Sequence, residues 1–288
     1  MSLVYFDNNV VTINGGMIKS VIARAVDPLN PLGLPPYTIR VKYATGTSPS
    51  SGSNSLDAAT KTLVNSTNNI WDVTYENSDW KGLFFDQTNL LEVIGANTTG
   101  VTILGSSSNN TGCFENCSSL TSVALFDTSN VTTMARMFVY CDSLHTVPLF
   151  NMLNVESLKY MFYHCKALQS VPFFDTSHVN NMYGTFEQSN IITLPEFNMI
   201  SVTNIDNMCY QCGALKTIPL FRNTDNIINA YRTFAVTVNV ESGALALYQQ
   251  LSSQTNPPRS HSRMFSQCGT NTETGSAELE QIPSDWKN

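Results

Sequence analysis

Cysteine provides the first candidate for chemistry in this sequence. The 288-residue chain has seven cysteines, two of them spaced as Cys209-x-x-Cys212, and this spacing occurs in zinc sites and in redox motifs. No second cysteine pair and no nearby histidine completes a set of four zinc ligands. We therefore expect no metal at this pair, and nothing in the chain predicts a cofactor.

The spacing of the other cysteines indicates a structural role. Five of the seven occupy the same position of a repeated pattern: Cys117, Cys141, Cys165, Cys212 and Cys268. We expect them to stack inside the fold as small apolar side chains. An odd number of regularly placed cysteines indicates reduced thiols and not the disulfide framework of a secreted protein.

Histidines and carboxylates show no catalytic arrangement. The four histidines fall at different positions of the repeat: His145, His164, His178 and His261. The sequence contains no G-x-S-x-G, H-E-x-x-H, P-loop or G-x-G-x-x-G motif. Acidic pairs such as Asp175 with Glu187 have no spacing suited to glycoside hydrolysis. We expect a binding protein and not an enzyme.

Charge and hydropathy exclude two classes of partner. Charged residues make up 13% of the chain, and 15 basic against 22 acidic residues give a net charge of −7 with no basic cluster, so we expect no nucleic-acid partner. No apolar run approaches the roughly 20 residues of a membrane span. The first residues, MSLVYFDNNVVTINGG, lack the basic and apolar regions of an ordinary export signal. We expect no membrane partner.

A repeat positions all of these residues. An aromatic residue precedes cysteine by three residues at Phe114/Cys117, Phe138/Cys141 and Phe162/Cys165, each set 24 residues after the last. The frame continues with substitutions at Phe186/Ser189, Cys209/Cys212 and Phe265/Cys268. After it come two apolar anchors three residues apart, at Leu90/Val93, Leu120/Val123, Leu144/Val147, Leu168/Val171, Ile191/Leu194, Leu215/Ile218 and Leu279/Ile282. Polar corners such as Asp127-Thr-Ser-Asn-Val131 follow the anchors.

This period predicts a β-rich leucine-rich-repeat solenoid of about seven turns, with a 23–25-residue period, one short parallel strand per turn and a small N-terminal α+β cap. We divide the chain into an attachment segment (1–33), the capping unit (34–87) and the solenoid (88–288). An insertion at 235–262 interrupts the solenoid, either as a tolerated corner or as a docking element.

The segments outside the repeat have their own predicted elements. In 1–33 we expect strands at LVYF and VVTI, followed by MIKSVIARAV. In the capping unit we expect a strand at YTIRVKYA, a hairpin of KTLV and IWDVTY, and a helix from Asn77 or Ser78 with Trp80, Leu83 and Phe84 on one face. In the insertion, the spacing of Leu245, Leu247, Tyr248 and Leu251 predicts a helix.

The repeat also resembles a known family. The segments SLTSVALFDTSNVTTMARMFVYC (119–141) and ALQSVPFFDTSHVNNMYGTF (167–186) are similar to the BspA-type leucine-rich repeats of bacterial surface proteins, over about residues 90–234 and 263–286. The resemblance implies a solenoid used in adhesion. Such proteins usually carry an export signal and an anchor, and neither is apparent in this sequence.

These features predict a protein that presents a binding surface. The first hypothesis is a bacteriophage virion subunit, in a head or tail fibre or as a decoration protein, made in the host cytoplasm and joined to other virion proteins through 1–33. The alternative is a bacterial cell-surface adhesin of the BspA type, and a third is an intracellular scaffold. The expected partner is a protein or surface glycan on a bacterial host, and a homo-oligomer is compatible with the sequence.

The candidate binding face lies between the two anchors of each turn. The second of the two intervening residues is uniform: Ser122, Thr146, Ser170, Thr193, Thr217 and Gln281. The first varies from turn to turn: Thr121, His145, Gln169, Ile192, Lys216 and Glu280. Because the anchors face the core, at least one intervening residue faces outward. The varying position is therefore the predicted recognition face.

Overall fold

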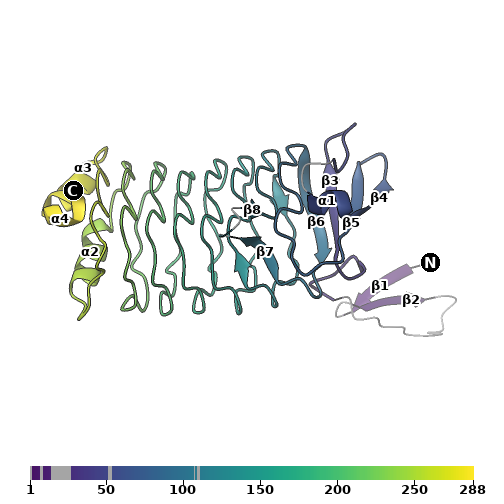
Figure 1. Ribbon diagram of the computed structural model, residues 1–288, viewed down its shortest axis with the longest axis horizontal. Helices are drawn as coiled ribbons and strands as arrows, with labels where there is room; N and C mark the ends of the chain where they lie inside the picture. The colour runs from purple at the N-terminus through teal and green to yellow at the C-terminus, as the bar shows by residue number, and fades with distance from the viewer. Residues whose placement is uncertain (1, 7–8, 14–26, 51–53, 107, 109–110) are drawn as a thin grey trace.

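The computed structural model describes residues 2–6, 9–13, 27–50, 54–106, 108 and 111–288. Its strands are β1 (Ser2–Phe6), β2 (Asn9–Ile13), β3 (Thr38–Tyr43), β4 (Thr60–Asn65), β5 (Ile70–Thr74), β6 (Leu90–Asn97), β7 (Ile103–Ser106), β8 (Thr111–Gly112), β9 (Ser122–Val123) and β10 (Thr133–Met134). Its helices are α1 (Asn54–Ala58), α2 (Ala244–Ser252), α3 (Glu273–Gln281) and α4 (Ser284–Lys287). Between the two ends, successive coils of chain lie side by side along the long axis (Figure 1). The chain is a β-rich repeat protein with open sheets and few helices.

The strands expected near the N-terminus are present. β1 pairs with β2 in an antiparallel hairpin, whereas the expected continuation MIKSVIARAV (17–26) lies outside the described residues. The strand at YTIRVKYA is β3, and the predicted hairpin is β4 with β5. The sheet order is β4-β5-β3-β6-β9, and β6 pairs in parallel with β9 of the following coil. The capping sheet therefore continues into the repeat.

The prediction of a helix after Asn77 is wrong. Trp80, Leu83 and Phe84 are buried as anticipated, but residues 81–86 form consecutive turns. Gly82 and Asp86 have φ values of 66° and 62°, and this left-handed conformation ends an α-helix. The N–H of Phe84 donates to the carbonyl of Cys113 at 2.8 Å. Residues from about 79 therefore form the first coil and not a separate helix.

Consecutive turns also form one side of the later coils. Of the N–H groups in residues 134–141, those at even positions donate to carbonyls of the next coil at 2.9 to 3.1 Å, while those at 137, 139 and 141 donate to the carbonyl three residues earlier. Parallel bridges accompany this ladder, joining Thr133 to Ser157, Ser157 to Asn181, Asn181 to Asn204, Asn204 to Asn229 and Asn229 to Ser260. Hydrogen bonds between neighbouring coils therefore pair backbone N–H and C=O groups that have no contact with water.

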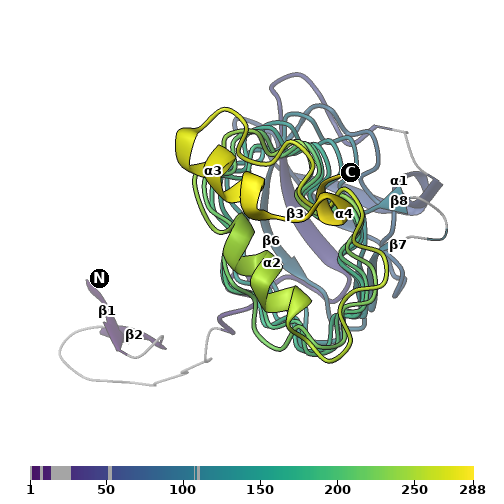
Figure 2. The ribbon, with the colours of Figure 1, turned by 90° about the vertical axis from the view of Figure 1, so that its left-hand side faces the viewer.

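The expected strand in every repeat is only partly present. At the anchor positions, the described residues form β9 and isolated bridges, such as Ser122 with Thr146 and Thr217 with Ser242. A proline directly follows the second anchor in four successive coils, at Pro148, Pro172, Pro195 and Pro219. Proline has no N–H to give to a ladder, which accounts for the short pairing on this side. Seen along the long axis, the coils have an oval outline, with β6 on one side and β7 and β8 on the other (Figure 2).

Stacked phenylalanines fill the centre. Ring centroids lie 5.5 to 5.8 Å apart along the frame column of Phe84, Phe114, Phe138, Phe162 and Phe186, with interplanar angles of 6° to 13°. Cys209 interrupts this column, and Phe197 and Phe221 from a second column connect Phe186 to Phe234. Each buried ring stabilises the fold by about 1.5–3 kcal/mol. The stack thus ties every coil to its neighbours.

The cysteines are buried, as predicted. All seven are free and buried. The thiol of Cys141 donates to the carbonyl of Phe114 and that of Cys165 to the carbonyl of Phe138, both at 3.1 Å. Burial raises the pKa of each of these two thiols. Such protonated, enclosed thiols are poor nucleophiles and poor metal ligands.

The polar corners stack on each other as expected. The side chain of Asp127 accepts a hydrogen bond from the N–H of Ser129 at 2.8 Å, and Asp175 does the same for Ser177 at 3.1 Å. The buried hydroxyl of Thr128 donates to the carbonyl of Asn151 in the next coil at 2.9 Å. The hydrogen bonds from Ser177 lower the pKa of Asp175.

The C-terminal end differs from the expected repeat. The predicted anchors Leu279 and Ile282 lie in and directly after α3, so they form no strand. Thr272 begins this helix by accepting a hydrogen bond from the N–H of Gly275 at 3.1 Å, a favourable N-cap. Trp286 of α4 then covers the last ring of the core, with its centroid 6.5 Å from that of Phe265.

The helix predicted within 235–262 is α2. Residues on either side of it stay in the ladders, because Ser242 bridges Thr217 and Ser260 bridges Asn229. α2 buries Leu247 and Leu251 over the end of the core. Among the described residues, no helix has the length and apolar character needed to cross a membrane.

Candidate binding surfaces

The predicted recognition residues form a row except for one. Thr121, His145, Gln169, Ile192 and Lys216, here called the variable row, occupy equivalent positions of successive coils. The N–H of His145 donates to the carbonyl of Thr121 at 3.3 Å, and that of Lys216 to the carbonyl of Ile192 at 3.1 Å. Four of the five are exposed, and Ile192 is half-buried. The uniform residues beside them are exposed as well.

Glu280 does not belong to this row. It is exposed on α3, because the C-terminal sequence forms a capped helix where the repeat predicted a strand. The row therefore ends at Lys216, whose ammonium pairs with the carboxylate of Glu241 at 3.0 Å. Both side chains of this pair are about half exposed.

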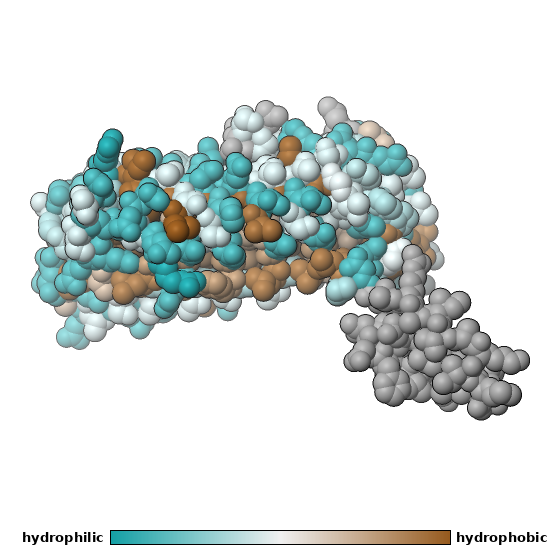
Figure 3. Space-filling model, turned by 90° about the horizontal axis from the view of Figure 1, so that it is seen from below, coloured by the Kyte–Doolittle hydropathy of each residue, from teal (hydrophilic) through white to brown (hydrophobic). Residues whose placement is uncertain are grey.

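An apolar row runs beside the variable row. Leu125, Leu149, Phe173 and Leu220 stand at equivalent positions and are 40 to 58% exposed. Glu196 occupies the same position in the intervening coil, and the guanidinium of Arg222 lies 5.0 Å from the centroid of Phe173. Exposed hydrophobic side chains also occur in short runs among polar ones on the lower surface (Figure 3). The apolar row is thus interrupted by charge.

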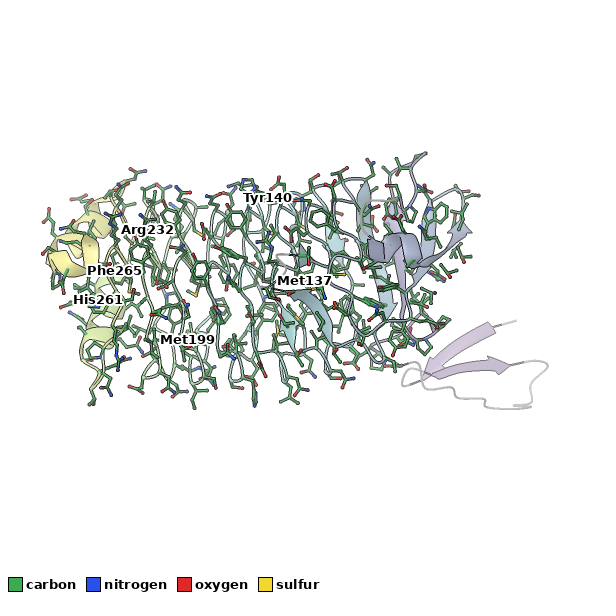
Figure 4. The ribbon with its side chains drawn as sticks, viewed as in Figure 1. Met137, Tyr140, Met199, Arg232, His261 and Phe265 are labelled. Atoms are coloured by element: carbon green, nitrogen blue, oxygen red, sulfur yellow. The ribbon has the colours of Figure 1, made fainter. Side chains whose placement is uncertain are left out.

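The turn-built side of the coils carries a different set of residues, here called the Tyr–Arg face. Its members are Arg136, Tyr140, Tyr160, Tyr163, Tyr183, Tyr210, Tyr231 and Arg232. Tyr140 and Arg232 lie toward the upper edge of the molecule, away from Met199 at the lower corner (Figure 4). The side chains come from the segments around each frame position.

Several residues of the Tyr–Arg face have a left-handed backbone conformation. Non-glycine residues with positive φ recur two residues before and two residues after the frame position: Arg136, Tyr140, Tyr160, His164, Gln188, Asn207, Gln211, Arg232, Val236, Arg263 and Gln267. Such a conformation costs on the order of 1–3 kcal/mol per residue. The hydrogen bonds between coils impose it, because the N–H of Tyr160 donates to the carbonyl of Tyr183 at 2.9 Å.

Cations lie over several of the tyrosine rings. The guanidinium of Arg136 is 5.8 Å from the centroid of Tyr160. The Lys159 ammonium is 5.6 and 5.3 Å from those of Tyr160 and Tyr183. Arg232 is 5.5 and 4.9 Å from the centroids of two further rings, those of Tyr210 and Tyr231. These contacts fix the rings and charges relative to each other.

A hollow of about 420 Å³ opens in the middle of the face. It is lined by Arg136, Tyr140, Tyr160, Tyr163 and Glu187, and we call it the tyrosine hollow. The ring of Tyr163 meets those of Tyr140 and Tyr160 nearly perpendicularly, at centroid distances of 5.3 and 5.6 Å. The hollow therefore presents both ring faces and ring edges.

Glu187 is the unusual group of this hollow. Its residue is 9% exposed, and its Oε2 is buried with no hydrogen-bond partner in the described structure. Burial raises the pKa of Glu187 to about 7, and the charge of Arg232 opposes the rise. The carboxylate also raises the pKa values of Tyr160 and Tyr163, after the larger effect of burial.

The other carboxylate near the hollow is fully engaged. The carboxylate of Glu115 accepts hydrogen bonds from Nε and Nη2 of Arg136, with an Nε–Oε2 distance of 3.1 Å, and from the N–H of Gly112 at 2.9 Å. Its side chain is 6% exposed. Arg136 is thus neutralised locally, which leaves Glu187 as the carboxylate of the hollow without an ion-pair partner among the described residues.

A second hollow, also of about 420 Å³, lies at the C-terminal end of the same face. Its lining includes Tyr210, Arg232, Arg263 and Lys287. In the described part of the chain, no group of three or more His, Cys, Asp or Glu side chains is placed to hold a metal. His164 pairs with Asp142 at 2.9 Å, and His261 stacks on Trp286.

Comparison with known proteins identifies the repeat. Residues 79–192, 108–223 and 147–245 match the sequence model of a family described as "Mycoplasma protein of unknown function, DUF285". The overlapping matches together span 79–245, which is more than half of the chain. The chain belongs to the DUF285 family. No curated protein and no solved structure matches it.

The DUF285 matches coincide with the stacked coils. They begin in the coil of Phe84 and reach α2, so they include the variable row and the Tyr–Arg face. They agree with the expected similarity to BspA-like surface repeats. The capping strands β3, β4 and β5 lie before them.

The sequence contained a signal for the Tyr–Arg face that the prediction did not use. The position two residues before the frame aromatic also varies between coils: Arg136, Tyr160, Gly184, Asn207, Arg232 and Arg263. The same criterion that selected the variable row therefore applies here. In the sequence, we apply this criterion only between the anchors, where we expect an extended strand.

Proposed function

We propose that the DUF285 coils form a leucine-rich-repeat solenoid of about seven turns, that the protein is not an enzyme, and that the Tyr–Arg face is its recognition surface. The observation that carries this proposal is the concentration of tyrosine and arginine around the tyrosine hollow. Tyrosine and arginine are enriched among the residues that dominate binding energy. Stacked repeats provide long continuous surfaces for partners.

The variable row is the second candidate surface, favoured by its exposure in successive coils. The row contains no tyrosine, tryptophan or arginine, the side chains that usually contribute most to affinity. The partner we propose is a protein or a surface glycan on a bacterial host, and neither nucleic acid nor membrane.

The setting we propose is a phage virion, in which the protein is a fibre or decoration subunit attached through residues 1–33. A bacterial cell-surface adhesin of the BspA type is the alternative. The family description names a bacterial genus and gives no function.

Binding of the full chain to host cells tests the surface assignment. Fluorescently labelled protein should be retained by host cells, and changing Tyr140 and Tyr163 together to alanine should reduce retention at least tenfold. Changing His145, Gln169 and Lys216 together to alanine is the matched control and should leave retention within about twofold. Loss of binding only in the control variant would transfer the function to the variable row. Deletion of residues 1–33 should leave cell binding intact but prevent incorporation into virions.

A further inference from the structure

The tyrosine hollow contains groups whose binding capacity the protein itself does not use. Among the described residues, cations lie over the rings of Tyr160, Tyr183, Tyr210 and Tyr231, and none lies over Tyr140 or Tyr163. Tyr140 is 38% exposed and stands at the mouth of the hollow beside Tyr163. The ring of His164 packs against Tyr140, with centroids 4.8 Å apart, so the exposed part of the Tyr140 ring and the part of Tyr163 that lines the hollow are the ring surfaces left for a ligand.

The carboxylate of Glu187 lines the same hollow without an ion-pair partner among the described residues. Arg136, which also lines the hollow, is held by Glu115 through two nitrogens. Arg232, whose charge acts on Glu187, lies over the rings of Tyr210 and Tyr231. A buried carboxylate without a partner is costly to keep charged. An incoming cation would remove that cost and would find aromatic rings beside it.

The overall charge of the chain favours a cation, although Arg136 and Lys159 lie beside the hollow. The chain carries a net charge of −7, which attracts positively charged ligands at long range. A cation between an aromatic ring and a carboxylate is a recurrent mode of recognition, because the ring quadrupole and the anion act together.

We propose that the tyrosine hollow receives a positively charged side chain, arginine or lysine, from a partner protein, with Tyr140 and Tyr163 against the cation and Glu187 as its counter-ion. This inference rests on the proposed function of the Tyr–Arg face and specifies what that face recognises. A neutral glycan would use the same rings but would not need a charged Glu187.

If a cation binds beside Glu187, its affinity should rise with pH, whereas a neutral glycan would not need a charged Glu187. The groups that face Glu187 are Arg136, Arg232, Tyr160, Tyr163 and the His164–Asp142 pair. Because the pKa of Glu187 is about 7, the carboxyl group is mainly neutral at pH 6 and mainly ionised at pH 8. Cation binding should therefore strengthen several-fold over this range.

Nuclear magnetic resonance of the full chain with ¹³C-labelled tyrosine rings can test this directly. The probe is N-acetyl-arginine methylamide, and its neutral match is N-acetyl-citrulline methylamide, which has the same shape without the charge. The arginine probe should shift the Tyr140 and Tyr163 signals and bind at least tenfold more tightly at pH 8 than the citrulline probe. Glu187→Gln should abolish both this preference and the pH dependence, whereas Glu196→Gln, at an exposed position, should change neither.

Equal binding of the two probes, or binding that Glu187→Gln leaves unchanged, would overturn the cation assignment. Shifts of the same rings by maltotriose, with no effect of the arginine probe, would assign the hollow to a neutral glycan. The cell-binding experiment with the Tyr140 and Tyr163 double variant is independent of these probes. A failure of the cation assignment is thereby distinguished from a failure of the proposed recognition face.

Discussion

The two long sides of the coils hold their exposed residues by different means. The variable row projects from short, poorly paired segments after which proline stops the ladder, and its residues make few side-chain contacts. The Tyr–Arg face projects from consecutive turns with left-handed residues, and its side chains contact each other through rings, cations and a buried carboxylate. Exposed residues thus vary between coils on both sides, whereas the left-handed residues and the buried, unpaired carboxylate lie on the Tyr–Arg face. Strained or electrostatically unfavourable positions that persist in a fold often mark function.

The largest expected difference between the sides concerns their ion pairs. Arg136→Ala leaves Glu115, whose side chain is 6% exposed, without its guanidinium and removes the cation over Tyr160. We expect a loss of about 2–3 kcal/mol in the free energy of unfolding. Lys216→Ala breaks the exposed pair with Glu241 and should cost under about 0.5 kcal/mol. Equal losses in urea unfolding would remove this distinction between the two sides.

A glycine substitution tests the strained backbone of the Tyr–Arg face. Gly184 has a φ of 58°, and a Cβ there would overlap the ring of Tyr160. Gly184→Ala should therefore lower the unfolding free energy by about 1–3 kcal/mol and displace Tyr160. Gly213, where an added Cβ would meet no other atom within 4 Å, is the control: Gly213→Ala should change stability by under about 0.5 kcal/mol. A tolerated Gly184→Ala would show that the turn can relax.

The smallest effect is expected on the variable row. Changing His145, Gln169 and Lys216 together to alanine removes exposed side chains without opening the core. Each position should contribute under about 0.5 kcal/mol, so the melting temperature should change by only a few degrees. A large drop would mean that this side also carries structural interactions.

Much of the fold was predictable because the core repeats. The Phe–Cys frame, the apolar anchors and the Asp-Thr-Ser corners all recur at the same period, and burial of each follows from its chemistry. The capping hairpin and α2 were predictable from local pattern alone. The C-terminal anchors Leu279 and Ile282 were misassigned because their spacing of three residues fits a helix equally well, and Thr272 supplies an N-cap that decides for the helix.

The site was less predictable than the fold. Residues at left-handed positions, such as Tyr140 and Tyr160, follow no propensity rule, since the bonds between coils impose their conformation. The burial of Glu187 depends on rings contributed by two preceding coils, at separations that a single repeat does not reveal. The exposed residues vary between coils on both sides, so the sequence indicates both surfaces equally. The three-dimensional arrangement of the side chains is what distinguishes the two.

The Tyr–Arg face keeps the carboxylate of Glu187 buried at a cost to stability, and the pH dependence of unfolding measures this cost. The folded pKa of Glu187, about 7, exceeds its ordinary value of 4.5, so its contribution is fully present below about pH 4.5 and is lost as pH rises through 7. Between pH 5 and pH 8, the native protein should therefore lose about 1–3 kcal/mol relative to Glu187→Gln in urea unfolding, while Glu196→Gln parallels the native protein. If the difference between native protein and Glu187→Gln stays constant over this range, Glu187 is not a buried, unpaired carboxylate and the account of this face is wrong.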